Sequence, residues 1–148
     1  MAGAVFSTWT TYGTWLPGDE RGWFQRARGF QSAETLRTLE AALRMTDDAA
    51  TLDGDQRSLV EATIAAHCGF RGWKLHAVNC RSNHVHVVVT APNRTREVPR
   101  EQFKAWCSRK LSEAGPARKN WQSERGWDVD LDDDESLAVV VDYVNERQ

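Results

Sequence analysis

The sequence predicts an α+β fold in which helices pack against one antiparallel sheet. The chain has 148 residues, of which 41% are hydrophobic and 27% charged, and this composition fits a single compact domain over residues 1–148. Strand-like and helical segments follow one another without the regular alternation that a parallel sheet requires. Two of the strand-like segments are close enough in sequence to pair as a hairpin.

The N-terminal half is expected to form one strand and two helices. Val5–Thr11 alternates apolar and polar residues and is rich in β-branched and aromatic types, which is typical of a strand. A glycine-containing loop follows. Leucines at helical spacing after Ser32, a candidate N-cap, predict a helix over Ser32–Met45. A second helix is predicted over Asp55–His67, with Gly69 closing it.

The C-terminal half is expected to supply the hairpin and two more helices. The elements are a hairpin of Trp73–Asn79 and His84–Thr90, a helix over Arg100–Glu113, a short extended or irregular piece over Trp121–Leu131, and a final helix from about Asp133. Gly115 and Pro116 stop the first of these helices. The final helix carries leucine and valine residues at helical spacing, so one face of it is expected to be buried.

Neither a secretion signal nor a membrane span is evident in the sequence. No stretch approaches the roughly 20 apolar residues that cross a bilayer, so an intracellular protein is expected. The three cysteines, Cys68, Cys80 and Cys107, are widely separated and odd in number. This pattern argues against a disulfide framework or a CxxC zinc site and predicts reduced, mostly buried thiols.

Opposite charges are segregated along the chain, although the net charge is only −2. The window 94–119 carries a net charge of +5, and 128–135 is rich in carboxylates without a basic residue. A basic surface that binds DNA phosphates and a solvated helix face both fit the basic window. The candidate nucleic-acid-binding residues in it are Arg94, Arg96, Arg100, Lys104, Arg109 and Lys110.

Two histidines stand two positions apart on the second arm of the hairpin. Successive strand residues point to opposite faces, so His84 and His86 share one face while Val85 and Val87 share the other. Two imidazoles placed in this way can bind one divalent cation if a third group completes the ligand set. The alternative is a pair of half-buried histidines hydrogen-bonded to neighbours. His67 and His76 are weaker candidates.

Tyr143 is one of only two tyrosines and lies on the final helix. A phenol with a pKa near 10 attacks phosphorus poorly unless a cation beside the phosphate stabilises the developing charge. Residues three to five positions further along are about one helical turn away and could reach the same ion or phosphate. The alternative is an aromatic residue that only packs the helix.

The combination of these features resembles the single-tyrosine HUH transposases, which include insertion-sequence and REP-associated tyrosine transposases. The resemblance covers most of the chain. It includes the opening strand, the core motif from Asn83 through His84 and His86, and the helix that carries Tyr143. It implies the ferredoxin- or RRM-like HUH endonuclease fold, a bacterial cytoplasmic location, and association with the nucleoid during action.

The resemblance also implies a set of residue roles. His84 and His86 would hold Mg²⁺ or Mn²⁺, and Tyr143 would attack single-stranded DNA to leave a 5′-phosphotyrosine link and a free 3′-hydroxyl. The basic helix would hold the DNA backbone, often next to a hairpin, through salt-sensitive contacts. Unpaired bases could stack on exposed tryptophans. The candidates are Trp9, Trp15, Trp23, Trp121 and Trp127.

The chain departs from the family pattern at a few positions. Ser82 stands where a proline frequently precedes the motif asparagine, and the segment 25–57 is longer than in compact members. The third metal ligand in relatives is an amide about one turn after the tyrosine. Here Asn145 and Gln148 are both available, and we favour Gln148.

Three functions fit the sequence. The first is a metal-dependent DNA nickase and strand transferase, and the second is a domesticated hairpin or single-strand DNA-binding protein without turnover. A small-molecule phosphoesterase is the third, but that class generally has two histidine-containing repeats and this chain has one. The family includes monomers and homodimers, and the sequence does not choose between them or reveal the DNA sequence recognised.

Overall fold

A computed structural model describes residues 3–13, 23–25, 29–31, 49–116, 118 and 120–146. The helix predicted over Ser32–Met45 lies outside these residues. The described elements, in chain order, are β1 (Ala4–Thr11), β2 (Trp23–Gln25), β3 (Gly29–Gln31), α2 (Gly54–Arg71), β4 (Lys74–Cys80), β5 (His84–Thr90), α3 (Glu97–Ala114), β6 (Gln122–Leu131) and α4 (Asp134–Glu146).

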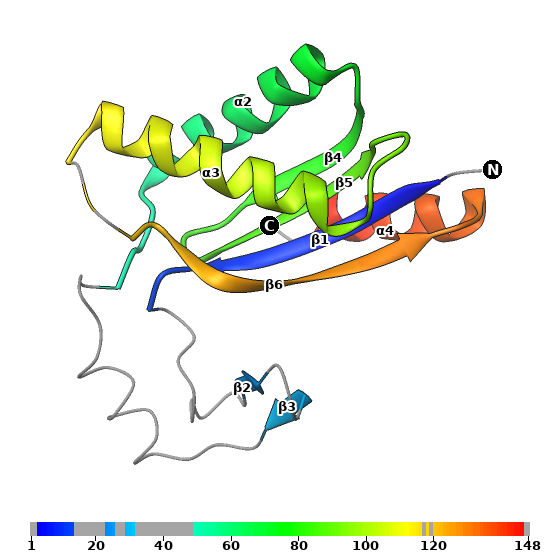
Figure 1. The fold of residues 1–148 in the computed structure, drawn as a ribbon, viewed down its shortest axis with the longest axis horizontal. Helices are drawn as coiled ribbons and strands as arrows, with labels where there is room; N and C mark the ends of the chain where they lie inside the picture. The colour runs from blue at the N-terminus through cyan, green and yellow to red at the C-terminus, as the bar shows by residue number, and fades with distance from the viewer. Residues whose placement is uncertain are drawn as a thin grey trace.

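Four strands form one sheet in the order β4-β5-β1-β6, and every neighbouring pair is antiparallel (Figure 1). The short strands β2 and β3 pair separately, within the segment expected to be a loop. The predicted α+β class with an antiparallel sheet is therefore confirmed. The strand β1 lies in the middle of the sheet because it pairs with both β5 and β6.

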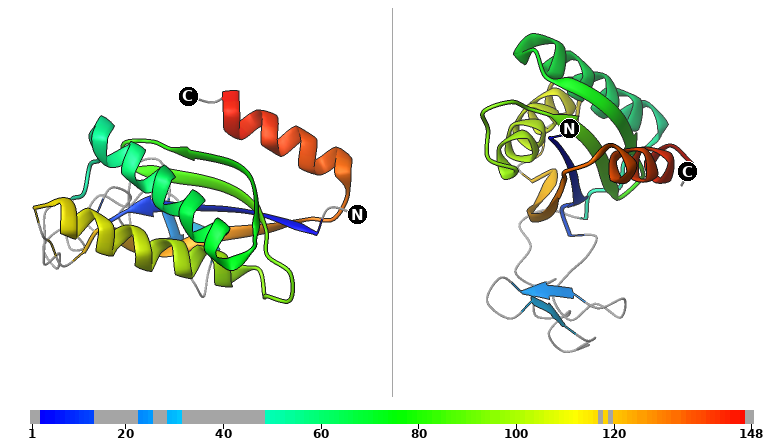
Figure 2. Two further views of the ribbon diagram at one scale, coloured as in Figure 1. Left: turned by 90° about the horizontal axis from the view of Figure 1, so that it is seen from above. Right: turned by 90° about the vertical axis from the view of Figure 1, so that its right-hand side faces the viewer.

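The helices form two layers around this sheet. α2 and α3 pack side by side over one face, and α4 lies over the other (Figure 2). The side chains between the sheet and α2–α3 form the larger core, which includes Trp9, Ile64, Val87 and Phe103, each 0% exposed. A smaller cluster between the sheet and α4 includes Val88 and Val144.

The hairpin of β4 and β5 follows the predicted bounds closely. Val85, Val87 and Val89 are 0% exposed and belong to the larger core. The alternation of side chains along a strand then turns the residues between them, including both histidines, toward the α4 side. The position of the histidine pair follows directly from this alternation.

Several elements extend beyond their predicted bounds, and the helix predicted over Arg100–Glu113 begins at Glu97 and ends at Ala114. The helix α2 continues past Gly69 to Arg71, because the turn that ends it is at Gly72, whose φ of 73° is left-handed and whose N–H bonds to carbonyls of the last turn. The piece predicted to be short or irregular is the ten-residue strand β6. Its pairing with β1 stabilises this extended conformation, which the local sequence only weakly favours.

The expectations for cysteines and membrane spans can be compared with the described residues. Cys68, Cys80 and Cys107 are free and buried, as predicted, and burial raises the pKa of the Cys68 thiol to about 11. Among the described residues, no helix combines the length and apolarity needed to cross a bilayer.

Candidate active site

A row of four side chains crosses the sheet on the face that α4 partly covers. Asn79, His86, Thr8 and Trp127 are paired in register across β4, β5, β1 and β6. Residues directly opposite one another on antiparallel strands project to the same face. Thr10 and His84 form the next pair on this face, toward the β4–β5 turn.

The two histidines lie against each other at the start of β5. Their ring centroids are 4.8 Å apart and the rings meet at 75°. The Nδ1–H of His84 donates to the amide oxygen of Asn83 at 2.8 Å. This bond fixes the tautomer and leaves the lone pair of His84 on Nε2, the arrangement that outer-shell partners impose on metal-binding histidines.

His86 occupies a more enclosed position. Its ring stacks on Phe6 with centroids 5.6 Å apart, and its Nδ1 is buried without a hydrogen-bond partner. Burial, the neighbouring His84 and Arg81 together lower the pKa of His86 to about 4. Burial and Arg81 also lower the pKa of His84. Both imidazoles are therefore neutral near pH 7, which is the form that binds metal ions.

Tyr143 meets this pair from α4. Its ring centroid is 6.0 Å from that of His86, with the rings edge to face at 77°, and 6.5 Å from that of Phe6. The side chain is 44% exposed, so the phenol remains accessible from solvent. Two residues separated by 57 positions in the sequence thus come into contact on one face of the sheet.

Hydrogen bonds and apolar contacts fix α4 in this place. At its N-terminus the Asp133 carboxylate accepts from the Ser136 backbone N–H at 2.7 Å, which caps the helix. Along its length Val144 is 0% exposed, and Leu137, Val140 and Val141 pack against the smaller cluster. This apolar stripe matches the one predicted for the final helix.

The site supplies two of the donors that a divalent cation would need. The two imidazoles are neutral, and the buried Nδ1 of His86 has no protein partner. No cluster of three or more His, Cys, Asp or Glu residues suited to a metal occurs within the described part of the chain. A third ligand from an amide, as the resemblance implies, would not belong to such a cluster. Gln148 lies outside the described residues.

Arg100 and Lys104 depart from the expectation of a basic surface. They are 9% and 8% exposed. The Arg100 guanidinium pairs with Asp128 at 3.0 Å, and Ser7 donates to the same carboxylate at 2.7 Å. Both residues lie on the buried side of α3, so they are unavailable to a DNA backbone. A side chain at Gly126 would collide with this arrangement, because a Cβ there would stand 2.5 Å from Arg100 Cδ and 2.8 Å from the Thr8 carbonyl oxygen.

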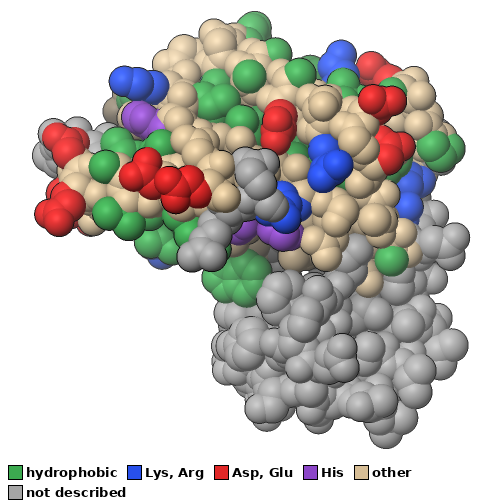
Figure 3. Space-filling view, turned by 180° about the vertical axis from the view of Figure 1, so that it is seen from behind, with side chains coloured by type: hydrophobic (Ala, Val, Ile, Leu, Met, Phe, Trp, Pro, Cys, Tyr) green, Lys and Arg blue, Asp and Glu red, His purple; other side chains and the backbone are tan. Residues whose placement is uncertain are grey.

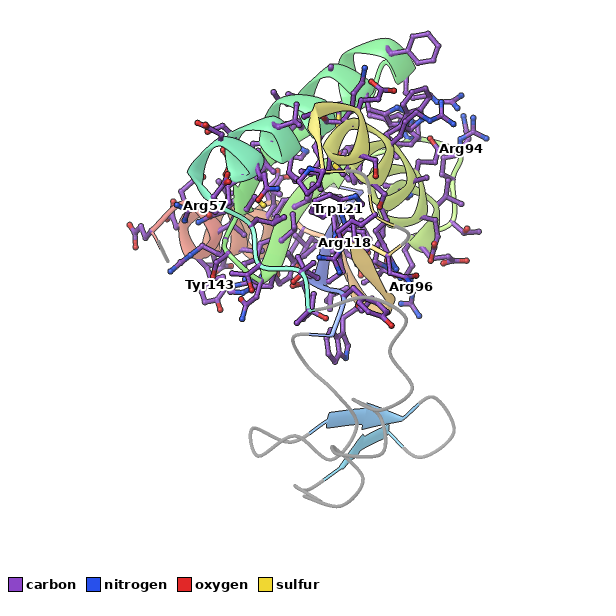
Figure 4. All side chains as sticks on the ribbon, turned by 90° about the vertical axis from the view of Figure 1, so that its left-hand side faces the viewer. Arg57, Arg94, Arg96, Arg118, Trp121 and Tyr143 are labelled. Carbon is purple, nitrogen blue, oxygen red and sulfur yellow. The ribbon has the colours of Figure 1, made fainter. Side chains whose placement is uncertain are left out.

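The other candidate DNA-binding residues are exposed but do not surround the site. Arg94 and Arg96 lie on the opposite side of the molecule from Tyr143 (Figure 4). Arg96 is 3.4 Å from Asp130, Arg109 stacks on Trp106, and Lys110 is 3.6 Å from Glu113. Figure 3 shows histidine side chains next to basic ones on the α4 side of the molecule.

Two tryptophans on the list of stacking candidates are buried. Trp9 is 0% exposed and Trp121 is 4% exposed, whereas Trp127 is 38% exposed. Trp15 lies outside the described residues, as does the side chain of Trp23. Trp127 is therefore the described member of the list that bases could reach.

The weaker histidine candidates have other partners. His67 Nε2 is 2.7 Å from Gln102 Oε1, and its ring packs between aromatic side chains of the larger core. His76 Nε2 is 2.8 Å from Thr90 Oγ1. The sequence interpretation did not single out Asn79 or Phe6, which both line the site. A polar residue among apolar ones in this strand could have pointed to Asn79. Its relation to the site is recognisable only from the strand register, which pairs it with His86.

Solved structures share this fold. A structure of a REP-associated tyrosine transposase bound to a REP hairpin aligns with a TM-score of 0.58 and 14% sequence identity, over 97% of this chain and 64% of that chain. A crystal structure from Deinococcus radiodurans R1, provisionally assigned as a transposase, aligns with a TM-score of 0.50 and 12% identity, over 98% of this chain and 90% of that one.

These similarities establish the fold and confirm that the resemblance to tyrosine transposases holds for the architecture. This chain spans 64% of the length of the hairpin-bound transposase. The sequence matches no protein-family model and no curated protein.

Proposed function

We propose that this chain is a metal-dependent nickase and strand transferase of single-stranded DNA, with Tyr143 as the nucleophile. The observation that carries the proposal is the edge-to-face contact between the phenol ring of Tyr143 and the imidazole of His86, with centroids 6.0 Å apart. A nucleophile held beside two neutral imidazoles that can bind a cation, on an accessible face of the sheet, supports phosphoryl transfer by the tyrosine.

His84 and His86 would hold the divalent cation, Mg²⁺ or Mn²⁺, with an amide such as that of Gln148 as a third ligand. The bound ion would stabilise charge on the scissile phosphate. Asn83 fixes the ring orientation of His84 through the 2.8 Å hydrogen bond. Phe6 supports the ring of His86 by stacking, so both imidazoles are held before any ligand arrives.

In the proposed step the phenolic oxygen of Tyr143 attacks phosphorus and the bond from phosphorus to the 3′ oxygen breaks. The phenol loses its proton and the departing 3′ oxygen gains one, which gives a free 3′-hydroxyl and a 5′-phosphotyrosine link. No oxidant, reductant or ATP is consumed, because the new phosphodiester retains the energy of the old one. The same atoms can therefore reverse the step and join strands. The Tyr143 phenol and the two imidazoles come from one chain, so the reaction can proceed in cis.

The DNA would lie across the part of the sheet face that α4 leaves open. Trp127, in register with Thr8 and His86, offers an exposed aromatic ring for an unpaired base near the cleaved phosphate. The exposed residues Arg94, Arg96, Arg109 and Lys110 remain candidates for contacts with the DNA backbone. Because Arg94 and Arg96 lie away from Tyr143, they would contact DNA remote from the cleavage point, such as a hairpin stem.

The test is to incubate the protein with Mn²⁺ and a pool of hairpin-containing single strands and to look for a denaturation-resistant protein–DNA adduct. Mass spectrometry should locate the adduct on Tyr143. Tyr143→Phe should abolish the adduct and leave oligonucleotide binding intact. Tyr12→Phe, which changes the other tyrosine of the chain, is the matched control and should retain the adduct. Adduct formation by Tyr143→Phe would refute the assignment.

The same assay separates the other two functions. A DNA-binding protein without turnover would bind the oligonucleotides and cleave none of them at any Mn²⁺ or Mg²⁺ concentration. A phosphoesterase would hydrolyse a cyclic phosphodiester, and that activity would survive Tyr143→Phe. The nickase predicts the opposite result in both experiments.

A further inference from the structure

Asn79 is a buried polar residue near the end of β4, on the same face as the histidines. Its side chain is 4% exposed, and it pairs in register with His86 on the neighbouring strand. Its Nδ2 donates to the backbone carbonyl of Val144 at 2.9 Å, across a buried contact between the sheet and α4. Val144 is the residue that follows Tyr143.

The acceptor of this hydrogen bond is in the last turn of α4, which ends at Glu146. A buried carbonyl left without a hydrogen bond is unfavourable, so the amide of Asn79 stabilises the last turn of α4 in the position where the two groups meet. The restraint therefore acts one residue from the proposed nucleophile.

Two other kinds of contact restrain α4 in a different way. The Asp133 cap is at the far end of the helix, about ten residues before Tyr143 along the chain. The contacts of Val140, Val141 and Val144 with the smaller cluster are apolar, and apolar burial has no directional preference. A directional hydrogen bond at the C-terminal end fixes the rotation and the height of the last turn over the sheet.

We propose that Asn79 is a positioning residue that holds the tyrosine helix on its own sheet, so that the Tyr143 phenol stays beside the His86 imidazole. The catalytic consequence rests on the function proposed above. The positional consequence does not, because the hydrogen bond, the register and the ring contact belong to the protein alone.

The experiment compares the wild-type protein with Asn79→Leu and Asn79→Asp. Both replacements are close to Asn in size and remove the side-chain N–H donor. Asn79→Leu does so without adding a charge. Ser7→Ala is the matched control, because Ser7 is equally buried but bonds to Asp128 on the opposite face of the sheet. Nuclear Overhauser contacts between the ring protons of Tyr143 and His86 report the positioning without metal or DNA.

We expect both Asn79 variants to weaken these ring contacts several-fold and Ser7→Ala to preserve them. The single-turnover rate of adduct formation at saturating DNA should fall about 100-fold, the size of effect that a displacement of about 1 Å produces, with an unchanged Kd for the oligonucleotide. Unchanged ring contacts in both Asn79 variants would overturn the proposal. So would an equal loss of rate in Ser7→Ala.

Failure of the function proposed for the chain would look different. A wild-type protein that forms no adduct would refute the nickase. The ring contacts would still decide whether Asn79 positions Tyr143.

Discussion

The two faces of the four-stranded sheet are formed by alternate residues of the same strands. They differ in the types of side chain that they carry and in how completely the helices bury them. On the α2–α3 side, β1 and β5 contribute Val5, Trp9, Val85, Val87 and Val89 to the larger core. The same two strands contribute Phe6, Thr8, Thr10, His84 and His86 to the α4 side, where every one of these side chains is only partly buried.

The difference shows how one strand can serve stability and chemistry at once. Residues on the α2–α3 side are closed off by two long helices, and replacing them should mainly change the free energy of unfolding. Residues on the α4 side are covered by a single helix that also carries Tyr143. Neighbouring positions on β5 should therefore respond to substitution in opposite ways.

The largest effect is expected for His86→Ala. Loss of one of the two imidazoles should lower the rate of adduct formation by at least about 1000-fold, equivalent to about 4 kcal/mol of transition-state stabilisation. The half-buried ring is replaceable, so the urea midpoint should change little. Single-turnover kinetics measures the rate of adduct formation, and urea unfolding of the same preparation measures the midpoint. A fully active His86→Ala protein would show that the α4 face of the sheet takes no part in the reaction.

Arg100→Met should act on the other face. It leaves Asp128, whose side chain is 7% exposed, without its 3.0 Å partner. Removing one member of a buried ion pair typically costs about 3–5 kcal/mol, and urea denaturation should show a loss near the lower end of that range. DNA affinity should be unchanged. The exposed Arg109 is the control, since Arg109→Ala should have the reverse effect of weaker binding at constant stability.

Val87→Ala tests the neighbour of His86 directly. The side chain is 0% exposed in the larger core, so the shortened residue leaves a cavity and should cost about 2 kcal/mol in the free energy of unfolding. The adduct rate at 20 °C should match that of the wild type, provided that the protein remains folded. A large loss of the adduct rate with normal stability would mean that residues on the α2–α3 face also contribute to catalysis.

Asn83→Ala should have a smaller effect, which is restricted to the affinity for the metal ion. The amide of Asn83 accepts from His84 and fixes its tautomer. Loss of such an outer-shell partner weakens metal affinity by about 10-fold or more. The Mn²⁺ concentration at half-maximal rate should rise accordingly, while the rate at saturating Mn²⁺ recovers most of its value. An unchanged Mn²⁺ dependence would contradict this role.

A pH dependence of stability is also expected in the metal-free protein. Burial lowers the pKa of His86 to about 4, against about 6.5 for an unfolded chain. Between these values the unfolded state binds a proton that folded His86 does not, so the free energy of unfolding should fall as the pH falls from about 6.5 toward 4. Urea unfolding in EDTA should show this slope, and His86→Gln should flatten it. An equal slope in both proteins would assign it to other groups.

The sequence predicts the elements of the sheet better than their arrangement. The period-two pattern of β5 is enough to place His84 and His86 on the face opposite Val85 and Val87. The predicted strand β1 and the apolar stripe of α4 are also confirmed, because each depends on local spacing. β6 was predicted only as a short irregular or extended piece, since its strand conformation depends on pairing with β1 rather than on its own residues.

The arrangement of the site depends on contacts between distant segments. The meeting of Tyr143 and His86 requires the strand order β4-β5-β1-β6 and the return of α4 over β4 and β5, which no local pattern encodes. Arg100 was expected on the surface because an arginine on an amphipathic helix usually is. Its partner Asp128, 28 residues later, could be recognised only from the folded chain.

Gly126 connects the two sides of the sheet. It precedes Trp127, and it occupies the position where any Cβ would meet the Arg100 side chain and the Thr8 carbonyl. A methyl group at this position would have to displace either the guanidinium from Asp128 or β6 from β1. The second displacement would carry the indole of Trp127 away from the histidines. Because Gly126 has no Cβ, the Arg100–Asp128 pair can be buried on one side of the sheet while the indole of the next residue, Trp127, stays exposed on the other side.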